Sequence, residues 1–433
     1  MAKDRYANSN LLLERAERVI PLGSQTFSKS KIQYPHGYAP LYLKKGRGGR
    51  VWDVDDNEYV DLVCGLLPVL LGYCDPDVDA AIKAQLENGI SFSLATELEI
   101  ELAERLVEMI PCAEMVRFGK NGTDATSATI RLARAYTGRE HVLVCGYHGW
   151  QDWYIGATTR SKGVPKAVGE LTHKVPFNDL DVVRKMFRAY PDDVAAIILE
   201  PMNVVEPFPG YLEELKDLVH AHGALLIFDE VITGFRYAKG GAQELFGVTP
   251  DLSSFGKAMG NGMPISAVVG RADIMHEMEE IFFSSTFGGE TLSLAAAIAT
   301  VDKVRDKPVI ERLWGTGDKI AGSVAELLQR FNLSEVISLA GKAPWMLFQF
   351  LDHANASSAG IKTLFLKEML TQGVLLLGSN NICYAHDEDD IKLVVQAYES
   401  VFELIAHELE YPGMEERLGI PLVRPVFAVR SAD

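Results

Sequence analysis

The sequence predicts an α/β protein with a large domain around a mainly parallel central sheet and a smaller α+β domain built from both ends of the chain. Two observations support the large domain: short apolar runs typical of buried strands alternate with amphipathic helical patterns, and the links between them are short. A third supports the small domain, because the regular alternation stops after Gly270 and a different mixture of strands and helices follows.

Length and composition are those of a globular protein with more than one domain. The chain has 433 residues, of which 48% are hydrophobic and 23% charged, so it can bury a large core. We expect residues 1–60 and 307–433 to form the small domain in two pieces, and residues 61–306 to form the large domain. The net charge of −17 argues against nucleic acid or an anionic membrane as a partner.

The cysteines and the N-terminus indicate a reduced, cytoplasmic protein. Five cysteines are scattered along the chain without the close spacing of a zinc ribbon or a redox pair, so we expect reduced core or pocket thiols and no metal site. The opening residues MAKDRYANSN lack the apolar core of a signal peptide, and no apolar stretch approaches the roughly eighteen residues that a membrane span needs.

The first part of the chain predicts three helices and a hairpin. Helical periodicity covers residues 10–20 and stops at a Pro-Leu-Gly sequence, and capping residues begin two more helices, at 75–88 and 96–109. Residues 51–54 and 59–62 form a hairpin pattern around Asp-Asp-Asn. The polar and aromatic segment 24–40 has no clear period, which makes it a candidate substrate loop.

A glycine-rich turn follows the strand predicted at residues 114–118. The sequence GKNGTDAT leads into a helical pattern of small and apolar residues, so the turn lies at a helix N-terminus, where free amides favour a phosphate. The spacing of a Walker loop is absent. Taken alone, the turn is better explained as a glycine turn that only caps the helix.

Two further strands end in groups that could serve a ligand. The strand at 142–145 leads into Gly-Tyr147-His-Gly-Trp, whose rings could lie on a planar cofactor or belong to the core. The strand at 194–199 ends at Glu200, and a helix at 212–222 returns the chain to the sheet. In a parallel sheet all these strand ends open on one crevice.

The stretch from Ala224 to Gly262 supplies the most informative pair. The apolar run ALLIF ends in Asp229, and the run LSSFG ends in Lys257. Pyridoxal 5'-phosphate (PLP) needs a lysine amine for a Schiff base with its aldehyde and an acidic group beside its pyridine nitrogen. The pair therefore predicts PLP as the cofactor. Either residue by itself could instead be a solvated strand end or an exposed lysine at a helix start.

Beyond Gly270 the pattern predicts a long helix of small residues that opens at 284–290 and runs to about residue 304, followed by an α+β domain. The further helices are expected at residues 308–331, 358–371 and 387–409, and the strands at 336–340, 346–350 and 374–377.

These motifs, taken in order, resemble the class III branch of the fold-type I PLP aminotransferases, and within it the members similar to glutamate-1-semialdehyde aminomutase. The resemblance covers nearly the whole chain and rests on VWDVDDNEYVDL, EMVRFGKNGTDAT, RLARAYTGR, GYHGW, IILEPM, ALLIFDEVITGFR, GGAQELFGVTPDL and SSFGKAMGNGMPISAVVGR. It implies a PLP-dependent transaminase with the fold-type I architecture.

The resemblance also implies roles for single residues. Lys257 would form the Schiff base and move the proton, and Asp229 would pair with the pyridinium nitrogen. The other residues expected to bind the cofactor are Gly122 and Thr123 at the phosphate, Tyr147 and Val231 on the two ring faces, Glu200, and Thr286. Thr286 matches a threonine that family members lend to the phosphate of the neighbouring subunit, which implies a homodimer with shared sites.

Two departures from the aminomutases bear on the reaction. No arginine occurs between Arg18 and Arg47, where aminomutases have one for the substrate carboxylate, and residues 377–382 lack their glutamate. We therefore expect a two-substrate aminotransferase. The loop SKSKIQYPHGY resembles that of sugar-modifying aminotransferases in surface-polysaccharide operons, which suggests glutamate as donor and a sugar acid as acceptor. An aminomutase-type isomerase and a PLP-fold binding subunit without turnover are the alternatives.

Overall fold

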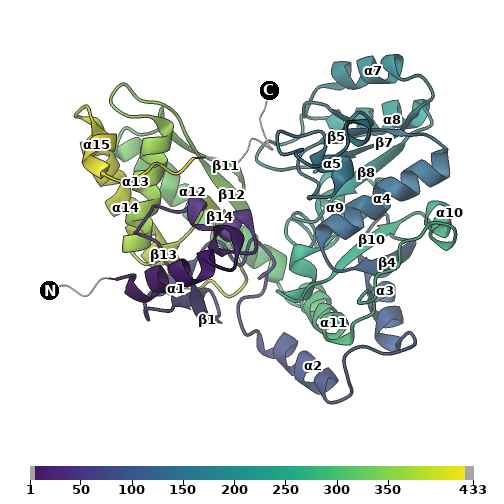
Figure 1. The fold of residues 1–433 in the computed structure, drawn as a ribbon, viewed down its shortest axis with the longest axis horizontal. Coiled ribbons are helices and arrows are strands. Elements are labelled where there is room, and N and C mark those ends of the chain that lie inside the picture. The colour runs from purple at the N-terminus through teal and green to yellow at the C-terminus, as the bar shows by residue number, and fades with distance from the viewer. Residues whose placement is uncertain (1–4, 425–433) are drawn as a thin grey trace. The chain divides into compact units, whose positions relative to one another are not determined.

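The computed structural model describes residues 5–424, and this part of the chain separates into two compact units. One unit comprises residues 76–310. The other joins residues 5–75 to residues 311–424, so that the purple and the yellow ends of the colour scale in Figure 1 belong to the same unit. The sequence analysis set the domain boundaries at 60/61 and 306/307, and the outermost residues of its ranges lie outside the described part.

A seven-stranded sheet forms the centre of the unit 76–310, with the order β4-β10-β9-β8-β7-β5-β6. Its strands are β4 (Met115–Gly119), β5 (His141–Cys145), β6 (Thr172–Lys174), β7 (Val194–Leu199), β8 (Leu225–Asp229), β9 (Leu252–Phe255) and β10 (Ser266–Gly270). Five consecutive strands of this order, β9, β8, β7, β5 and β6, pair with one another in parallel. Only β10 runs antiparallel to both β4 and β9 in this sheet, so the prediction of a mainly parallel sheet is confirmed.

The inner strands of this sheet are buried on both faces, which explains their continuous apolar sequences. Along β8, Leu225 and Ile227 pack with side chains of α4 (Gly122–Thr137) in one core cluster. Leu226 and Phe228 point to the other face and pack with side chains of α7 (Leu180–Ala189) and α8 (Tyr211–Ala221) in a second cluster. The sheet is thereby held rigidly between two layers of helices.

The remaining helices of this unit connect the strands or pack beside them. They are α2 (Pro76–Leu86), α3 (Glu97–Met109), α5 (Asp152–Ile155), α6 (Lys166–Gly169), α9 (Ala242–Phe246), α10 (Ala272–Met275), α11 (Thr291–Asp306) and the 3₁₀ turns η4 (Lys257–Gly260) and η5 (His276–Glu279). The small-residue helix α11 packs against α2 and α3. It begins later than the pattern predicted, because the Glu290 carboxylate accepts hydrogen bonds from the amides of Leu292 and Ser293 and caps the helix there.

The second unit has two small sheets covered by helices. Its strands are β1 (Leu43–Arg47), β2 (Arg50–Asp53), β3 (Glu58–Asp61), β11 (Ile337–Lys342), β12 (Trp345–Phe350), β13 (Val374–Leu375) and β14 (Ser379–Asn381). Its helices are α1 (Ala7–Glu17), α12 (Val309–Arg330), α13 (Ser358–Thr371), α14 (Glu388–Leu409) and α15 (Met414–Leu418). β13 pairs in parallel with β3, so the C-terminal part of the chain completes a sheet that the N-terminal part begins.

The segment expected to be irregular, residues 24–40, contains two single 3₁₀ turns, η2 (Phe27–Lys29) and η3 (Lys31–Gln33), after η1 (Pro21–Gly23). Its role as a substrate loop stays a prediction. None of the helices between residues 5 and 424 combines the length and the apolar character that crossing a membrane requires.

Candidate functional site

The turn between β4 and α4 presents a helix N-terminus next to the end of β8. The Asp124 carboxylate, in the first turn of α4, accepts hydrogen bonds from the amides of Lys120 (3.1 Å) and Asn121 (2.7 Å). These bonds fix the conformation of the turn. The next two amides, of Gly122 and Thr123, begin the helix. A methyl group at Gly122 would lie 2.7 Å from Val231 Cγ1, so only glycine allows this close approach.

Lys257 stands beside the same turn. It begins η4 directly after β9, and the residue before it, Gly256, reaches the turn: a Cβ built there would lie 3.6 Å from Gly122 Cα and 3.5 Å from Val231 Cγ1. The side chain of Lys257 is half-buried. The structure thus brings together the lysine, the glycine turn and Val231, which the sequence placed far apart.

Asp229 ends β8 and is held by three donors. Its carboxylate is 4% exposed; Oδ1 accepts from the Val231 amide (3.1 Å) and the Ser254 hydroxyl (3.3 Å), and Oδ2 lies 2.8 Å from His148 Nδ1. Because a carboxylate only accepts, His148 Nδ1 donates this bond. Asp229 is therefore a rigidly oriented negative charge at the carboxyl edge of the sheet.

His148 was not among the residues that the sequence analysis selected. It is 1% exposed and follows Tyr147 in the GYHGW segment. Its position next to Tyr147, which was already assigned to the cofactor, was the one feature of the sequence that could have indicated a role for His148. The pairing with Asp229 could not be read from the sequence because the two residues come from different strands of the sheet.

Glu200 contacts the backbone of Tyr147. It is 3% exposed, and its Oε2 accepts a hydrogen bond from the Tyr147 amide (3.1 Å). A Cβ at Gly146 would lie 2.6 Å from the same oxygen. The Tyr147 ring packs edge-on against Tyr154, with 5.8 Å between the ring centroids. Glu200 thus holds the turn that carries Tyr147.

Three buried polar atoms around the α4 N-terminus have no hydrogen-bond partner among residues 5–424 of this chain. They are Thr123 Oγ1, His148 Nε2 and Ser266 Oγ. A Cβ at Gly149 would collide with the Thr123 side chain, so the GYHGW turn closes tightly over the helix end. Buried polar atoms without partners are costly, and these three lie where a ligand bound at the helix end would supply partners.

These features fit PLP. The amides and hydroxyl at the start of α4 suit a phosphate, the Asp229 carboxylate suits a protonated ring nitrogen, and the Lys257 amine suits the aldehyde. Seven of the eight predicted residues lie on this group of turns at the carboxyl edge of the sheet. These are Gly122, Thr123, Tyr147, Glu200, Asp229, Val231 and Lys257.

The eighth, Thr286, lies elsewhere on the surface of its own chain. It is exposed in the loop between η5 and α11. At the end of that loop, Glu290 Oε2 lies 2.9 Å from Lys120 Nζ, which ties the start of α11 to the turn before α4. Burial raises the pKa of Glu290, but the hydroxyl of Ser293 and the Lys120 ammonium outweigh it and hold that pKa below its ordinary value.

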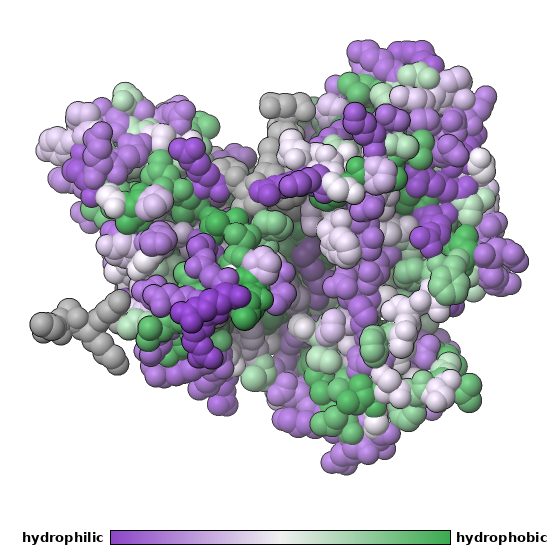
Figure 2. Space-filling view, in the orientation of Figure 1, coloured by the Kyte–Doolittle hydropathy of each residue, from purple (hydrophilic) through white to green (hydrophobic). Residues whose placement is uncertain are grey.

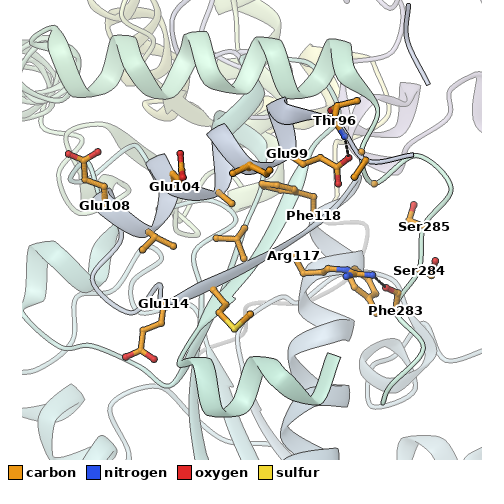
Figure 3. A pocket seen from close by; sticks show the side chains of 18 residues that line it. Thr96, Glu99, Glu104, Glu108, Glu114, Arg117, Phe118, Phe283, Ser284 and Ser285 are labelled. Carbon is orange, nitrogen blue, oxygen red and sulfur yellow. Dashed lines mark hydrogen bonds between the residues drawn. The ribbon is translucent and has the colours of Figure 1, made fainter. Parts of the chain in front are cut away.

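A cavity of about 760 Å³ opens beside this loop and contains none of the eight predicted residues (Figure 3). It is lined by Thr96, which caps α3, by Glu99 of α3, by Arg117 and Phe118 of β4, and by Ser284 and Ser285 of the loop. Arg117 donates a hydrogen bond to the carbonyl of Phe283 (3.3 Å), and the Thr96 amide donates to Glu99 (3.0 Å). Because it lacks the converging groups around Asp229, we do not assign the chemistry to this cavity.

Glu230, the neighbour of Asp229, has a structural role. It is fully buried, and its carboxylate accepts hydrogen bonds from the Thr233 hydroxyl and from the amides of Ala242 (2.7 Å) and Gln243 (2.8 Å). These amides begin α9. Glu230 therefore caps a helix from a distance and faces away from the reacting groups.

The exchange Gly122→Ala tests the phosphate turn. The added methyl group meets Val231 Cγ1 at 2.7 Å, so the turn must shift away from the position that the phosphate needs. We expect the dissociation constant for PLP, measured by equilibrium dialysis, to rise about tenfold or more. Gly322→Ala, inside α12, where a methyl group meets open space and the backbone is helical, is the matched control. Unchanged PLP binding in Gly122→Ala would contradict the placement.

The exchange His148→Phe tests the orientation of Asp229. It keeps a ring in the buried position but removes the donor to Oδ2, so the carboxylate loses one of its three hydrogen bonds. We expect kcat to fall by about tenfold and the free energy of unfolding by about 1–3 kcal/mol. Steady-state kinetics and urea denaturation measure both quantities. A variant with normal kcat and normal absorbance of bound PLP would remove His148 from the site.

Comparison with known proteins gives one consistent result. The family profile described as "Aminotransferase class-III" matches residues 33–388. A 3-aminobutyryl-CoA aminotransferase from Cloacimonas acidaminovorans is 36% identical over 406 residues, which cover 91% of this chain and 96% of that protein. A glutamate-1-semialdehyde 2,1-aminomutase from Syntrophobacter fumaroxidans is 38% identical over 430 residues, with 93% and 98% covered.

Solved structures agree with these sequences. The chain superimposes on the FumI protein of Sphingopyxis sp. MTA144, solved as its PLP internal aldimine form, with a TM-score of 0.88 and 29% identity. The superposition covers 95% of this chain and 100% of that protein. The likeness therefore includes both compact units.

Proposed function

Because the chain belongs to the class III family of aminotransferases, PLP-dependent enzymes of fold type I, we propose that it transfers an amino group from glutamate to the carbonyl carbon of a sugar or sugar acid. The observation that most supports transfer chemistry is the convergence of Asp229 and Lys257 on the glycine turn at Gly122. The acceptor and the donor are the parts of this proposal that go beyond the family.

Bound PLP supplies a carbonyl carbon that accepts the amino group and a ring that withdraws electrons from the neighbouring carbon. With PLP bound, the Asp229 carboxylate would accept a hydrogen bond from the ring nitrogen and favour its protonated form. His148 and Ser254 hold the Asp229 carboxylate in place. Lys257 Nζ anchors the cofactor, and afterwards takes the proton from the substrate carbon that bears the amino group.

The remaining residues bind and orient. The amides of Gly122 and Thr123 and the Thr123 hydroxyl hold the phosphate, while Val231 and Tyr147 enclose the ring. Glu200 keeps the Tyr147 turn closed through the backbone amide. Held in this way, the cofactor would present its reacting carbon to Lys257.

No arginine occurs between Arg18 and Arg47, where aminomutases have one that pairs with the substrate carboxylate. This difference supports a two-substrate transfer over an intramolecular exchange. The support for a sugar acceptor is narrower. Trp153 and Tyr154 are core residues, with Trp153 Nε1 donating to Ser127 Oγ (2.9 Å) and the Tyr154 hydroxyl donating to the Gly146 carbonyl (2.8 Å). Trp150, at 64% exposed, is the ring of this segment that remains for a sugar face.

A two-stage assay tests the proposal. The PLP-loaded enzyme is incubated with single amino acids, and release of the corresponding oxo acid identifies the donor. The aminated enzyme is then offered aldehyde and keto sugars, including 8-oxo-3,8-dideoxy-octulosonate, and amine formation is followed by mass spectrometry. We expect 2-oxoglutarate in the first stage and an amino sugar in the second. Conversion of glutamate-1-semialdehyde without any added donor would instead establish the isomerase.

We further propose that the enzyme is a homodimer in which Thr286 of the partner subunit completes the phosphate site. Thr286 is exposed in its own chain, and apolar side chains near it are also exposed: Leu94 (84%), Ile100 (61%) and Phe287 (56%). Figure 2 shows apolar side chains gathered over α2 and the loop that follows it. A second copy would remove this surface from water.

Mixed dimers test the shared site. Lys257→Ala and Thr286→Ala subunits are unfolded, mixed and refolded, so that one site of each mixed dimer carries both defects and the other carries neither. We expect the mixture to regain activity that neither variant has alone. No gain over the Thr286→Ala dimer would show that Thr286 acts only in its own subunit, and a monomer in light scattering would exclude the dimer.

A further inference from the structure

The unit formed by residues 5–75 and 311–424 contains a buried cluster of soft ligand atoms that the aminotransferase reaction does not use. Its members are Cys64, Cys383 and His386, and their ligand atoms all lie within 4.8 Å of one another. We propose that this cluster is a binding site for a thiophilic divalent cation, for which Zn²⁺ is the best match. The sequence pattern predicted reduced thiols and no metal, because no two cysteines have the close spacing of a zinc ribbon or a redox pair and the histidines are dispersed along the chain.

The fold builds this cluster from two distant segments. Cys64 follows β3, and Cys383 and His386 follow β14. The segments are held together by Asn381, whose amide donates to the Leu62 carbonyl (3.0 Å) and whose side chain donates to the Val63 carbonyl (2.7 Å). The two thiols are therefore brought close by backbone pairing, before any metal binds.

The spacing Cys383-Tyr-Ala-His386 forms a short turn that presents two ligands together. The His386 amide donates to the Cys383 carbonyl (3.2 Å), which closes the turn. A pair of ligands separated by two residues on a tight turn is common in zinc sites. Cys64 adds a third ligand. Its backbone is in the left-handed region, with φ of 47°.

The imidazole of His386 is already oriented as a ligand requires. Its Nδ1 accepts a hydrogen bond from the Cys383 amide (3.1 Å), so the ring proton is on Nε2, which donates to the Asp61 carbonyl (3.1 Å). Metal-binding histidines commonly donate their distal N–H to a backbone carbonyl in this way. A cation at Nδ1 would replace the Cys383 amide as the partner of that lone pair.

The chemistry of the cluster selects the metal. Two thiolates and an imidazole suit Zn²⁺ and exclude Mg²⁺ and Ca²⁺, which require oxygen ligands. The two thiolates would neutralise the cation, and this matters because all three residues are at most 2% exposed. Zn–S and Zn–N bonds of about 2.3 and 2.0 Å place tetrahedral ligand atoms roughly 3.5–3.8 Å apart. This spacing is compatible with a cluster whose ligand atoms all lie within 4.8 Å of one another.

Three protein ligands leave one tetrahedral position for water or a small ligand. The Asp61 carboxylate lies near the cluster, but its oxygens already accept hydrogen bonds from the amides of Val63 and Cys64 and from the hydroxyl of Tyr73 (2.7 Å). These bonds fix the loop that carries Cys64. The site would act as a cross-link between the two segments of this unit, independently of the transfer reaction.

Zinc binding to the PLP-loaded enzyme tests the proposal. The enzyme is treated with a chelator and a phosphine reductant, loaded with Zn²⁺, freed of excess metal by gel filtration and analysed for metal content. We expect one Zn²⁺ per chain, an X-ray absorption spectrum with sulfur and nitrogen ligands, and a higher melting temperature than that of the metal-free enzyme. Cys64→Ser and Cys383→Ser should each lose the metal, while Cys112→Ser, which changes a buried thiol of the other unit, should keep it.

Three results would overturn the site. These are a wild-type enzyme that retains no zinc, zinc retained equally by Cys64→Ser and Cys383→Ser, and a disulfide between Cys64 and Cys383 in enzyme purified under reducing conditions. Where a serine variant does not fold, the absorption spectrum of the wild-type enzyme decides alone, because zinc at surface sites would show oxygen and nitrogen ligands without sulfur.

Discussion

We expect the replacement of Lys257 by alanine to abolish transamination. In the proposed mechanism this lysine, which begins η4 beside the Gly122 turn, both anchors the cofactor and moves the proton at the substrate carbon. Lys120, the lysine of the turn itself, pairs with Glu290 at 2.9 Å. We expect kcat to fall by about four orders of magnitude or more, since the anchor and the general base are lost together. PLP should still bind through its phosphate, but without the visible absorbance of the lysine-bound form.

Rapid mixing with glutamate measures this effect, with oxo-acid release as the readout. Lys303→Ala is the matched control: Lys303 pairs with Asp77 on the surface at 2.7 Å, and its loss should leave turnover unchanged. Chemical rescue by added alkylamines would show that the amine itself, and not the fold, is missing. Normal turnover in Lys257→Ala would refute the assignment of the reactive lysine.

Replacing Asp229 with asparagine has the second largest expected effect. The amide keeps the size of the side chain but removes the negative charge that holds a proton on the ring nitrogen, so the ring withdraws fewer electrons. We expect kcat to fall by about a thousandfold, within the range observed for groups that act on a proton in the transition state. The half-reaction with glutamate, followed by absorbance, reports this step without the acceptor.

Glu230→Gln is the control for Asp229→Asn because the two residues are adjacent in the sequence but have different roles, one at the cofactor and one in the structure. Burial raises the pKa of Glu230, although its hydrogen bonds oppose that shift. The backbone amides of Ala242 and Gln243 donate to the Glu230 carboxylate, and a glutamine side chain would turn its own N–H group toward one of these donors. Because one hydrogen bond is lost and two donors face each other, we expect the free energy of unfolding to fall by about 2–3 kcal/mol. The folded variant should keep its turnover at low temperature. The reverse pattern, with stability lost in Asp229→Asn and turnover lost in Glu230→Gln, would exchange the two roles.

The sequence alone was sufficient for the central architecture because its strands are buried on both faces. The runs that became β7 and β8 are continuously apolar, and such runs occur where helices cover both sides of a parallel sheet. The same reasoning placed Asp229 and Lys257 at one edge, since parallel strands present their carboxyl ends together. The class III resemblance then supplied the cofactor and the family.

Other features were decided only by the tertiary structure. The antiparallel direction of β10, the hydrogen bond from His148 to Asp229 and the meeting of Cys64 with Cys383 all depend on which segments become neighbours in space. Periodicity and spacing describe a single segment, and they contain no information on strand direction or on contacts between segments far apart in the chain. The sequence determined which elements form and which chemical groups end them, and packing of those elements decided which groups meet.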